Sequence, residues 1–252
     1  MQLYDDIADS YHLIHSDWEA TSVGQAEILQ RILAGRLGAR SLDIRDVSCG
    51  IGTQSLGLAR LGHRVAGSDL SERALERARR MAHERGLEVR FSRADMRECA
   101  EADRSAFDAV ISCDNSLPHL LTDDDILTAL RAFAEALRPG GVALVTVRDY
   151  EHEPREVQFR PFGIREADGA RFVVYQIWDW DESGNHYDFG MYFVRDDGRN
   201  RPDVLVSRAR YYAISVGRLL ELMVQAGFEG VERIDDVYFQ PVLVGRKRGA
   251  DS

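Results

Sequence analysis

The sequence predicts an α/β protein with a doubly wound, mostly parallel sheet and an inserted antiparallel β meander. Three observations lead to this prediction. Short apolar segments alternate with amphipathic helical segments from residue 41 to residue 147. A glycine-rich turn, Gly50-Ile51-Gly52, joins the first strand to the helix that follows it. After Tyr150 the pattern changes to strand-like segments separated by residues that favour tight turns.

Composition sets limits on the class of protein. The chain has 252 residues, 32 Lys and Arg against 42 Asp and Glu, a net charge of −10, and 44% apolar residues. This apolar content excludes a mainly disordered chain, and no segment approaches the roughly 18 apolar residues of a membrane helix. The acidic balance gives no general attraction to nucleic acid or anionic lipid, so we expect neither as a partner. The N-terminus resembles no secretory signal, and we expect a cytoplasmic protein.

The three cysteines, Cys49, Cys99 and Cys113, are far apart in the sequence and form no C-x-x-C pair. This spacing favours neither a disulfide framework nor a structural zinc site, so no metal is expected.

The first part of the chain contains the alternating strands and helices. Ser71 is a good N-cap and Gly86 a good C-cap for one helix, and Pro139-Gly140-Gly141 ends another. The continuous apolar run Ala109-Val110-Ile111 is typical of a buried parallel strand. The predicted strands are Ser41–Val47, Arg64–Ser68, Glu88–Ser92, Phe107–Cys113 and Val142–Val147. The predicted helices are Gln25–Arg36, Thr53–Leu61, Glu72–Arg85 and Asp124–Leu137.

The second part of the chain predicts a three-stranded meander followed by a return to the α/β pattern. The meander strands are Phe172–Asp181, Tyr187–Asp196 and Val204–Tyr212, and the later elements are helix Val216–Ala226 and strands Gly230–Ile234 and Val242–Arg246. We therefore expect one domain, residues 1–252, in which the meander is a lid and not an independent unit. Its expected parts are an N-terminal cap (1–35), a ligand-binding core (36–150), the inserted lid (151–215) and a C-terminal helix with strands (216–248).

The segment from Asp46 to Thr53 is the most informative for function. Glycines at a strand-to-helix turn allow a ligand to approach the backbone, and the helix N-terminus offers free N–H groups. A dinucleotide fingerprint needs a third glycine where this chain has Ser55. An acidic residue at Asp46 suits an ammonium group better than a pyrophosphate. Taken alone, the turn is also compatible with a purely structural role.

This segment resembles the first motif of class I S-adenosylmethionine-dependent methyltransferases, D/E-x-G-x-G-x-G, with Ser48 at the first glycine position. Later segments match the family in order: an acidic residue after the second strand, another after the third, and a Pro-Gly-Gly turn before the fifth. The resemblance implies a Rossmann-like methyltransferase sheet that binds S-adenosylmethionine and releases S-adenosylhomocysteine. The cofactor-binding residues it implies are Asp46, Ser48, Gly50, Gly52, Asp69, Leu70, Asp95, Met96 and Cys113.

Segments after the fourth and fifth strands resemble the glycine/sarcosine N-methyltransferase branch of that family. The N-S-x-x-H-L pattern places Asn115 and His119, and Arg148 follows the fifth strand. The resemblance implies that Asn115 and Arg148 bind the carboxylate of a small amine. It also places His119, Tyr11 and Tyr211 at the acceptor site. An arginine suits this role because its planar guanidinium binds a carboxylate through two hydrogen bonds.

Several alternatives stay open at this point. Asn115, His119 and Arg148 are each also explained as a turn residue, a helix cap or a solvated strand end. The acceptor is either an amino acid-like amine or a natural-product intermediate methylated on nitrogen, oxygen or carbon. A nucleotide-binding oxidoreductase and a non-catalytic binding module are the alternatives from other classes. No residue is assigned as a catalytic base, and a homo-oligomer is compatible with the sequence.

Overall fold

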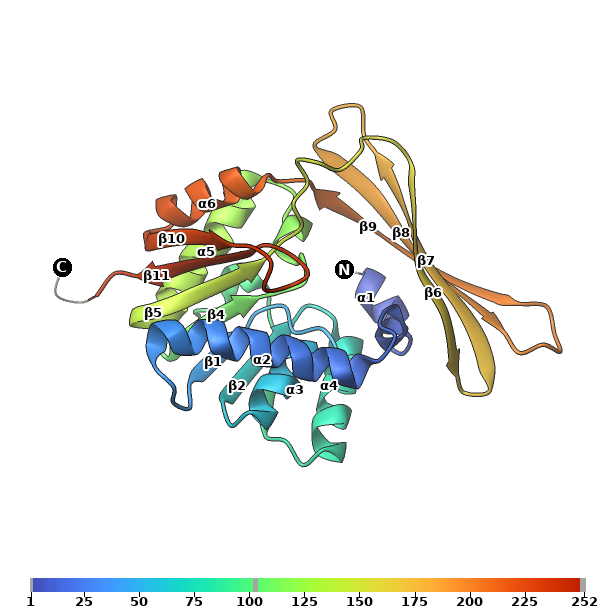
Figure 1. Ribbon diagram of the computed structural model, residues 1–252, viewed down its shortest axis with the longest axis horizontal. Coiled ribbons are helices and arrows are strands. Elements are labelled where there is room, and N and C mark those ends of the chain that lie inside the picture. The colour runs from blue at the N-terminus through green and yellow to red at the C-terminus, as the bar shows by residue number, and fades with distance from the viewer. Residues whose placement is uncertain (1, 102–103, 250–252) are drawn as a thin grey trace.

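The computed structural model describes residues 2–101 and 104–249, and two sheets dominate it. A seven-stranded sheet with its helices forms one part of the molecule, and a four-stranded sheet, here called the lid sheet, forms the other (Figure 1). The N-terminal helix α1 (Gln2–Ile7) lies between the two parts. This confirms the predicted α/β fold with an added antiparallel sheet.

The seven-stranded sheet has the order β10-β11-β5-β4-β1-β2-β3. Its strands are β1 (Asp43–Asp46), β2 (Arg64–Asp69), β3 (Val89–Arg93), β4 (Phe107–Ser112), β5 (Leu137–Thr146), β10 (Phe228–Ile234) and β11 (Val242–Lys247). The first five strands are parallel, and β11 runs antiparallel to both of its neighbours. Strand β1 lies between β2 and β4, so the strand order reverses there. In open α/β sheets ligands bind at the carboxyl ends of the strands beside such a reversal.

Helices cover both faces of this sheet. They are α2 (Trp18–Leu37), α3 (Thr53–Arg60), α4 (Glu72–Glu84), α5 (Asp123–Ala136) and α6 (Val216–Gln225), with short 3₁₀ helices η1 (Tyr11–Ile14), η2 (Met96–Glu98) and η3 (Leu117–His119). Side chains of α5 and α6 pack with one set of alternating strand residues, such as Val110. Side chains of α2 and α3 pack with the other set, such as Ala109 and Ile111. This is the alternation expected of a strand that is buried on both faces.

Helix α2 begins at Trp18, seven residues before the predicted start, so that predicted boundary is wrong. The Asp17 carboxylate caps the helix by accepting a hydrogen bond from the backbone N–H of Ala20 at 3.0 Å. Trp18 is buried, and its indole N–H donates to the Thr53 hydroxyl at 3.0 Å. These contacts stabilise a first turn whose sequence has weak helical periodicity.

The lid sheet has four antiparallel strands, whereas the sequence predicted three. They are β6 (Gln158–Ala167), β7 (Ala170–Trp180), β8 (His186–Asp196) and β9 (Asp203–Tyr212). Strand β6 was missed because Pro161 and Gly163 interrupt it, and its register with β7 shifts between them. An edge strand tolerates both residues, since one of its sides has no neighbouring strand to pair with.

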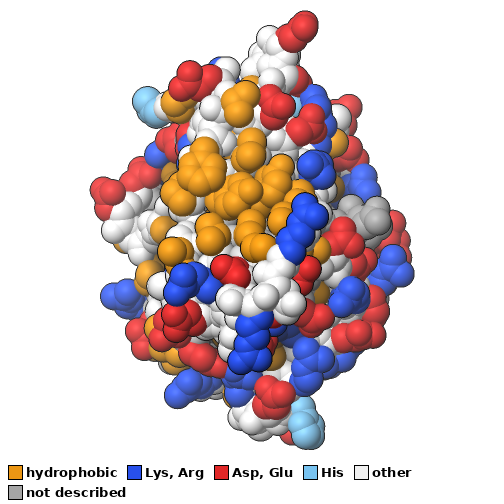
Figure 2. Space-filling view, turned by 90° about the vertical axis from the view of Figure 1, so that its right-hand side faces the viewer, with side chains coloured by type: hydrophobic (Ala, Val, Ile, Leu, Met, Phe, Trp, Pro, Cys, Tyr) orange, Lys and Arg blue, Asp and Glu red, His pale blue; other side chains and the backbone are white. Residues whose placement is uncertain are grey.

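The two faces of the lid sheet differ in what covers them. Trp178, Tyr187 and Met191 point toward the core and are buried. The opposite face carries apolar side chains in contact with solvent, including Phe159 at 64% and Ile164 at 61% exposure. Figure 2 shows hydrophobic side chains gathered on this outer face. The rest of the protein therefore buries one face of the lid sheet. On the other face, no segment of the described chain covers the apolar side chains.

Within the described part of the chain, no helix has both the length and the apolar character needed to cross a membrane.

Candidate active site

Two adjoining cavities occupy the region between the sheet edge, α1 and the lid sheet. The first, here called the strand-edge cavity, has a volume of about 360 Å³ and lies at the carboxyl ends of β1, β2, β3 and β4. The second, here called the lid cavity, has a volume of about 310 Å³ and lies between the ends of β4 and β5 and the inner face of the lid sheet. Tyr4, Tyr11 and Asp114 line both cavities. Both volumes fall in the range of roughly 300–1,000 Å³ that is usual for small-molecule sites.

The turn after β1 forms one wall of the strand-edge cavity. Gly50 has a φ of 51° and Gly52 a φ of 91°, values in the left-handed region that favours glycine. A Cβ at Gly52 would also lie 3.1 Å from the Leu56 Cγ. Ser48 and Gly50 line the cavity, while Gly52 stands behind them as the N-cap of α3. The glycines thus allow a tight turn that leaves its inner side open to a ligand.

Asp46 lies beneath this turn and does not line either cavity. It is 1% exposed, accepts a hydrogen bond from the Ser55 hydroxyl at 2.7 Å, and lies 3.4 Å from the backbone nitrogen of Ser48, which donates to it. Its direct role in the structure is to brace the turn.

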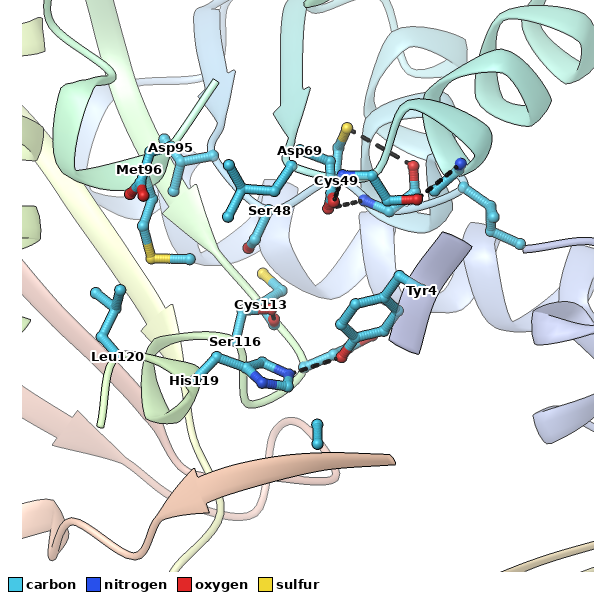
Figure 3. A pocket seen from close by; sticks show the side chains of 18 of the residues that line it. Tyr4, Ser48, Cys49, Asp69, Asp95, Met96, Cys113, Ser116, His119 and Leu120 are labelled. Carbon is cyan, nitrogen blue, oxygen red and sulfur yellow. Dashed lines mark hydrogen bonds between the residues drawn. The ribbon is translucent and has the colours of Figure 1, made fainter. Parts of the chain in front are cut away.

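Asp69 ends β2 and faces the strand-edge cavity. Backbone N–H groups of Gly50 and Ser71 each donate to its carboxylate at 2.9 Å, one to each oxygen. Figure 3 shows this carboxylate beside Cys49 and Ser48 at the turn. The two amides fix the direction of the carboxylate, and each oxygen keeps a lone pair for a ligand hydroxyl.

The opposite side of the strand-edge cavity comes from the segment after β3. The Asp95 carboxylate caps η2 through the backbone N–H of Arg97 at 2.9 Å and forms an ion pair with the Arg97 guanidinium. Met96 follows it in the cavity wall, and in Figure 3 both residues lie across the cavity from Tyr4. Leu70 and Cys113, the remaining cofactor-binding residues predicted from the sequence for this cavity, also line it. The wall thus combines a carboxylate with an apolar surface.

Three carboxylates, those of Asp46, Asp69 and Asp114, lie near the turn after β1. Burial raises the pKa of Asp46 to about 7 and also raises the pKa of Asp69 and of Asp114. Among residues 2–101 and 104–249, no Lys, Arg or His side chain lies within ion-pair distance of these three groups. Asp69 and Asp114 line the strand-edge cavity, where a ligand that brings its own positive charge stabilises the ionised form of each carboxylate. S-adenosylmethionine carries an ammonium and a sulfonium group, so the residues present fit this cofactor.

His119 lies where the N-terminal segment meets the lid sheet. Its Nε2 is 2.8 Å from the Tyr4 hydroxyl, and its ring centre is 4.0 Å from that of Tyr211. Burial lowers the pKa of His119 to about 3, so the imidazole is neutral, and its tautomer decides which partner donates in the hydrogen bond with Tyr4. The Tyr4–His119 hydrogen bond, drawn in Figure 3, joins α1 to the segment after β4. His119 therefore helps to hold α1 in place over the strand-edge cavity.

Asn115 and Arg148 come together in the wall of the lid cavity. Asn115 is 5% exposed; its amide N–H donates to the Tyr150 hydroxyl at 2.7 Å, and its amide oxygen accepts from the backbone N–H of Arg148 at 3.0 Å. The Arg148 guanidinium lies over the Trp178 ring, with its carbon 4.4 Å from the ring centre. No carboxylate in the described chain pairs with Arg148. Asn115 thus connects the segments that follow β4 and β5. Arg148 presents to the cavity a guanidinium that pairs with no carboxylate of the described chain.

The structure distributes the predicted residues over the two cavities. Ser48, Gly50, Asp69, Leu70, Asp95, Met96, Cys113 and His119 line the strand-edge cavity. Asn115, Arg148 and Tyr211 line the lid cavity, Tyr11 lines both, and Asp46 and Gly52 line neither. Sequence reasoning did not assign Asp114, Gln54, Phe162, Phe189 and Met191 to a site. Asp114 follows β4 directly, which is a usable signal, whereas the lid residues carry no motif.

Comparisons with known proteins show the class of enzyme. A family model described as a methyltransferase domain matches residues 44–141, which include the turn after β1, Asp69 and Asp95. The chain is a class I S-adenosylmethionine-dependent methyltransferase, with a small molecule as its methyl acceptor and S-adenosylmethionine as its cofactor.

Relatives cover the chain to different extents. The glycine/sarcosine N-methyltransferase of Parasynechococcus marenigrum is 29% identical over 224 residues, which is 87% of this chain and 73% of the relative. The ubiquinone biosynthesis O-methyltransferase of Alkalilimnicola ehrlichii is 37% identical over 115 residues, and the match spans only 44% of that relative. Similarity thus extends through most of the chain in the first case and is confined to about half of it in the second.

Solved structures show the same fold. DesVI of Streptomyces venezuelae has a TM-score of 0.80 at 22% identity, covering 96% of this chain and 97% of that one. CalS10 of Micromonospora echinaspora, described as an amino pentose methyltransferase and solved with S-adenosylmethionine, has a TM-score of 0.76 at 17% identity, covering 90% and 91%.

Proposed function

We propose that this methyltransferase N-methylates a small amine that carries a carboxylate, an amino acid-like acceptor of the glycine or sarcosine type. The observation that carries the proposal is the Arg148 guanidinium, which lines the lid cavity with no carboxylate partner in the described chain. An anionic ligand would form a charge-assisted pair with this half-buried guanidinium, which no carboxylate of the described chain neutralises. The extended similarity to a glycine/sarcosine N-methyltransferase supports the same acceptor class.

In this proposal the cofactor occupies the strand-edge cavity. Asp69 accepts hydrogen bonds from the ribose hydroxyls, Asp95 and Met96 hold the adenine, and the turn at Ser48 and Gly50 receives the methionine end. When bound there, S-adenosylmethionine supplies an electrophilic methyl group for transfer to the acceptor. The adjoining lid cavity holds the acceptor next to it, which fits the shared wall of the two cavities.

The protein's own contribution is to orient the acceptor and exclude water. Orientation of this kind supplies up to roughly 7–11 kcal/mol of a reaction barrier. Tyr4 and Tyr11 cover the junction of the cavities from the N-terminal side. No cysteine is suited to act as a nucleophile, since all three are buried and burial raises the pKa of Cys113.

The proposal is tested by replacing Arg148 and measuring methyl transfer to amino acids. We expect Arg148→Ala to raise the KM for the carboxylated acceptor at least 30-fold and to leave S-adenosylhomocysteine affinity within threefold. Arg155→Ala is the matched control, because Arg155 lies over Trp180 at 4.1 Å but does not line the lid cavity. An unchanged KM in Arg148→Ala would contradict the carboxylate anchor.

A second candidate is transfer to the nitrogen, oxygen or carbon of a larger natural-product intermediate. The observation that favours it is the volume of the lid cavity, about 310 Å³, which a glycine molecule would leave mostly empty. Turnover of a bulky acceptor without a carboxylate, equally fast in the wild type and Arg148→Ala, would establish this candidate in place of the first.

A further inference from the structure

Asp114 has the most unusual position of the carboxylates near the site. It follows β4 and lines both cavities, so it marks the point where cofactor and acceptor meet. Its backbone has a φ of 57°, a left-handed value that few residues other than glycine adopt. The Thr146 hydroxyl fixes this backbone by accepting from the Asp114 N–H at 2.8 Å. The fold thus holds a strained residue with its carboxylate at the junction.

The partners of the Asp114 carboxylate are neutral. The Gln54 amide donates to one oxygen at 2.7 Å and the Tyr238 hydroxyl donates to the other at 2.8 Å. These donors orient the carboxylate without neutralising its charge, and each oxygen retains a lone pair. A ligand ammonium is the group that would complete the site, because it supplies both a hydrogen bond and the missing positive charge.

The remainder of the lid cavity is apolar. Phe162, Phe189 and Met191 on the inner face of the lid sheet face Ile7 and Ile14 of the N-terminal segment. Phe189 and Met191 are 5% and 2% exposed, so water reaches little of their surface. The lid cavity is also nearly as large as the strand-edge cavity, which takes a nucleoside joined to an amino acid. Part of this space therefore suits an apolar group of substantial size.

We propose that the acceptor is an α-amino acid with a large apolar or aromatic side chain, bound at three points of the lid cavity. Asp114 holds the ammonium next to the cofactor and takes up the proton that this group must lose before its nitrogen attacks, so that the N–CH3 bond forms as the S–CH3 bond breaks and S-adenosylhomocysteine leaves. Arg148 holds the carboxylate, and the lid residues Phe162, Phe189 and Met191 receive the side chain. This assignment rests on the proposed function and narrows its acceptor class. It places Asp114 in direct contact with the reacting nitrogen and makes the inner face of the lid sheet the specificity surface.

The test measures acceptor binding separately from turnover. Calorimetry records the binding of glycine, leucine and phenylalanine to the protein saturated with S-adenosylhomocysteine, and methyl transfer to the same acceptors is assayed in parallel. We expect leucine or phenylalanine to exceed glycine at least tenfold in affinity and in kcat/KM. We also expect Asp114→Asn to weaken binding of the preferred amino acid at least tenfold and to leave S-adenosylhomocysteine affinity within threefold.

Two further variants distinguish the loss of the acceptor contact from a loss of folded structure. Asp114→Gly suits the left-handed backbone and is expected to lose acceptor binding in the same way as Asp114→Asn. Asp168→Asn is the matched control, because Asp168 has a φ of 50° and is exposed on the distal β6–β7 hairpin. It is expected to bind the preferred amino acid as the wild type does.

The possible failures are distinct. If glycine binds and reacts better than leucine and phenylalanine while Arg148→Ala still raises KM, the apolar acceptor is overturned and the proposed function stands. If Asp114→Asn weakens S-adenosylhomocysteine binding in place of acceptor binding, Asp114 belongs to the cofactor site and its assignment to the amine is overturned. If no amino acid binds or is methylated, the proposed function itself fails.

Discussion

The two adjoining cavities are built in different ways. The strand-edge cavity takes most of its polar groups from turns that directly follow β1, β2 and β3, each within a few residues of its strand. The lid cavity takes its walls from α1, η1, α2, the ends of β4 and β5, the segment before β11, and all four strands of the inner lid face. The strand-edge cavity is formed largely by short segments, each of which follows one strand of the sheet. The lid cavity exists only when distant parts of the chain are brought together.

The largest expected effect is on cofactor affinity and comes from Asp69, which lines the strand-edge cavity alone. Asp69→Ala removes the acceptor for two backbone amides and, in the proposed cofactor site, for the ribose hydroxyls, and hydrogen bonds to a charged group contribute about 1.5–3 kcal/mol each. We expect S-adenosylhomocysteine affinity to fall by about 100-fold or more in calorimetry. Asp124→Ala, at an exposed position of α5, is the control and should bind normally. If S-adenosylhomocysteine affinity fell less than threefold in Asp69→Ala, the turn after β1 would not define the cofactor site.

An intermediate effect concerns the frame of the lid cavity. Asn115→Ala removes hydrogen bonds to Tyr150 and Arg148 and leaves a φ of 67° that alanine disfavours. We expect the free energy of unfolding to fall by about 2–4 kcal/mol in denaturant titration. Asn115→Gly should lose about 1 kcal/mol less, because glycine adopts this φ readily.

S-adenosylhomocysteine affinity in both Asn115 variants should stay near the wild-type value, since the residue lines only the lid cavity. Equal destabilisation by alanine and glycine would rule out the backbone contribution.

The smallest effect comes from a residue in the shared wall. Tyr4→Phe removes the hydroxyl that is hydrogen-bonded to His119, a loss of about 0.5–1.5 kcal/mol for a typical hydrogen bond. Because Tyr4 lines both cavities, we expect the affinity for S-adenosylhomocysteine and the affinity for the acceptor each to fall about two- to fivefold. A change confined to one ligand would mean that the wall is not shared in solution.

The same contrast explains how much the sequence could predict. The sheet, its parallel strands and the residues around Gly50, Asp69 and Asp95 follow from local patterns, and the structure places them in one cavity. Strand β6 and the start of α2 were missed because their local signals are weak: Pro161 and Gly163 interrupt the strand, and the first turn of α2 depends on the burial of Trp18. Phe189 and Met191 follow the ordinary alternation of a half-buried strand, and Phe162 lies at the register shift of β6. Nothing in that alternation distinguishes a residue facing a cavity from one facing a packed core.

The shared wall of Tyr4, Tyr11 and Asp114 has a thermodynamic consequence. A ligand in one cavity that shifts these three side chains changes the affinity of the other cavity for its own ligand. The two binding equilibria are then linked. Linkage is reciprocal: the factor by which the cofactor changes acceptor affinity equals the factor by which the acceptor changes cofactor affinity. With cofactor and acceptor in the two cavities as proposed, the strength of cofactor binding would therefore depend on how much acceptor is present, without any additional regulatory site.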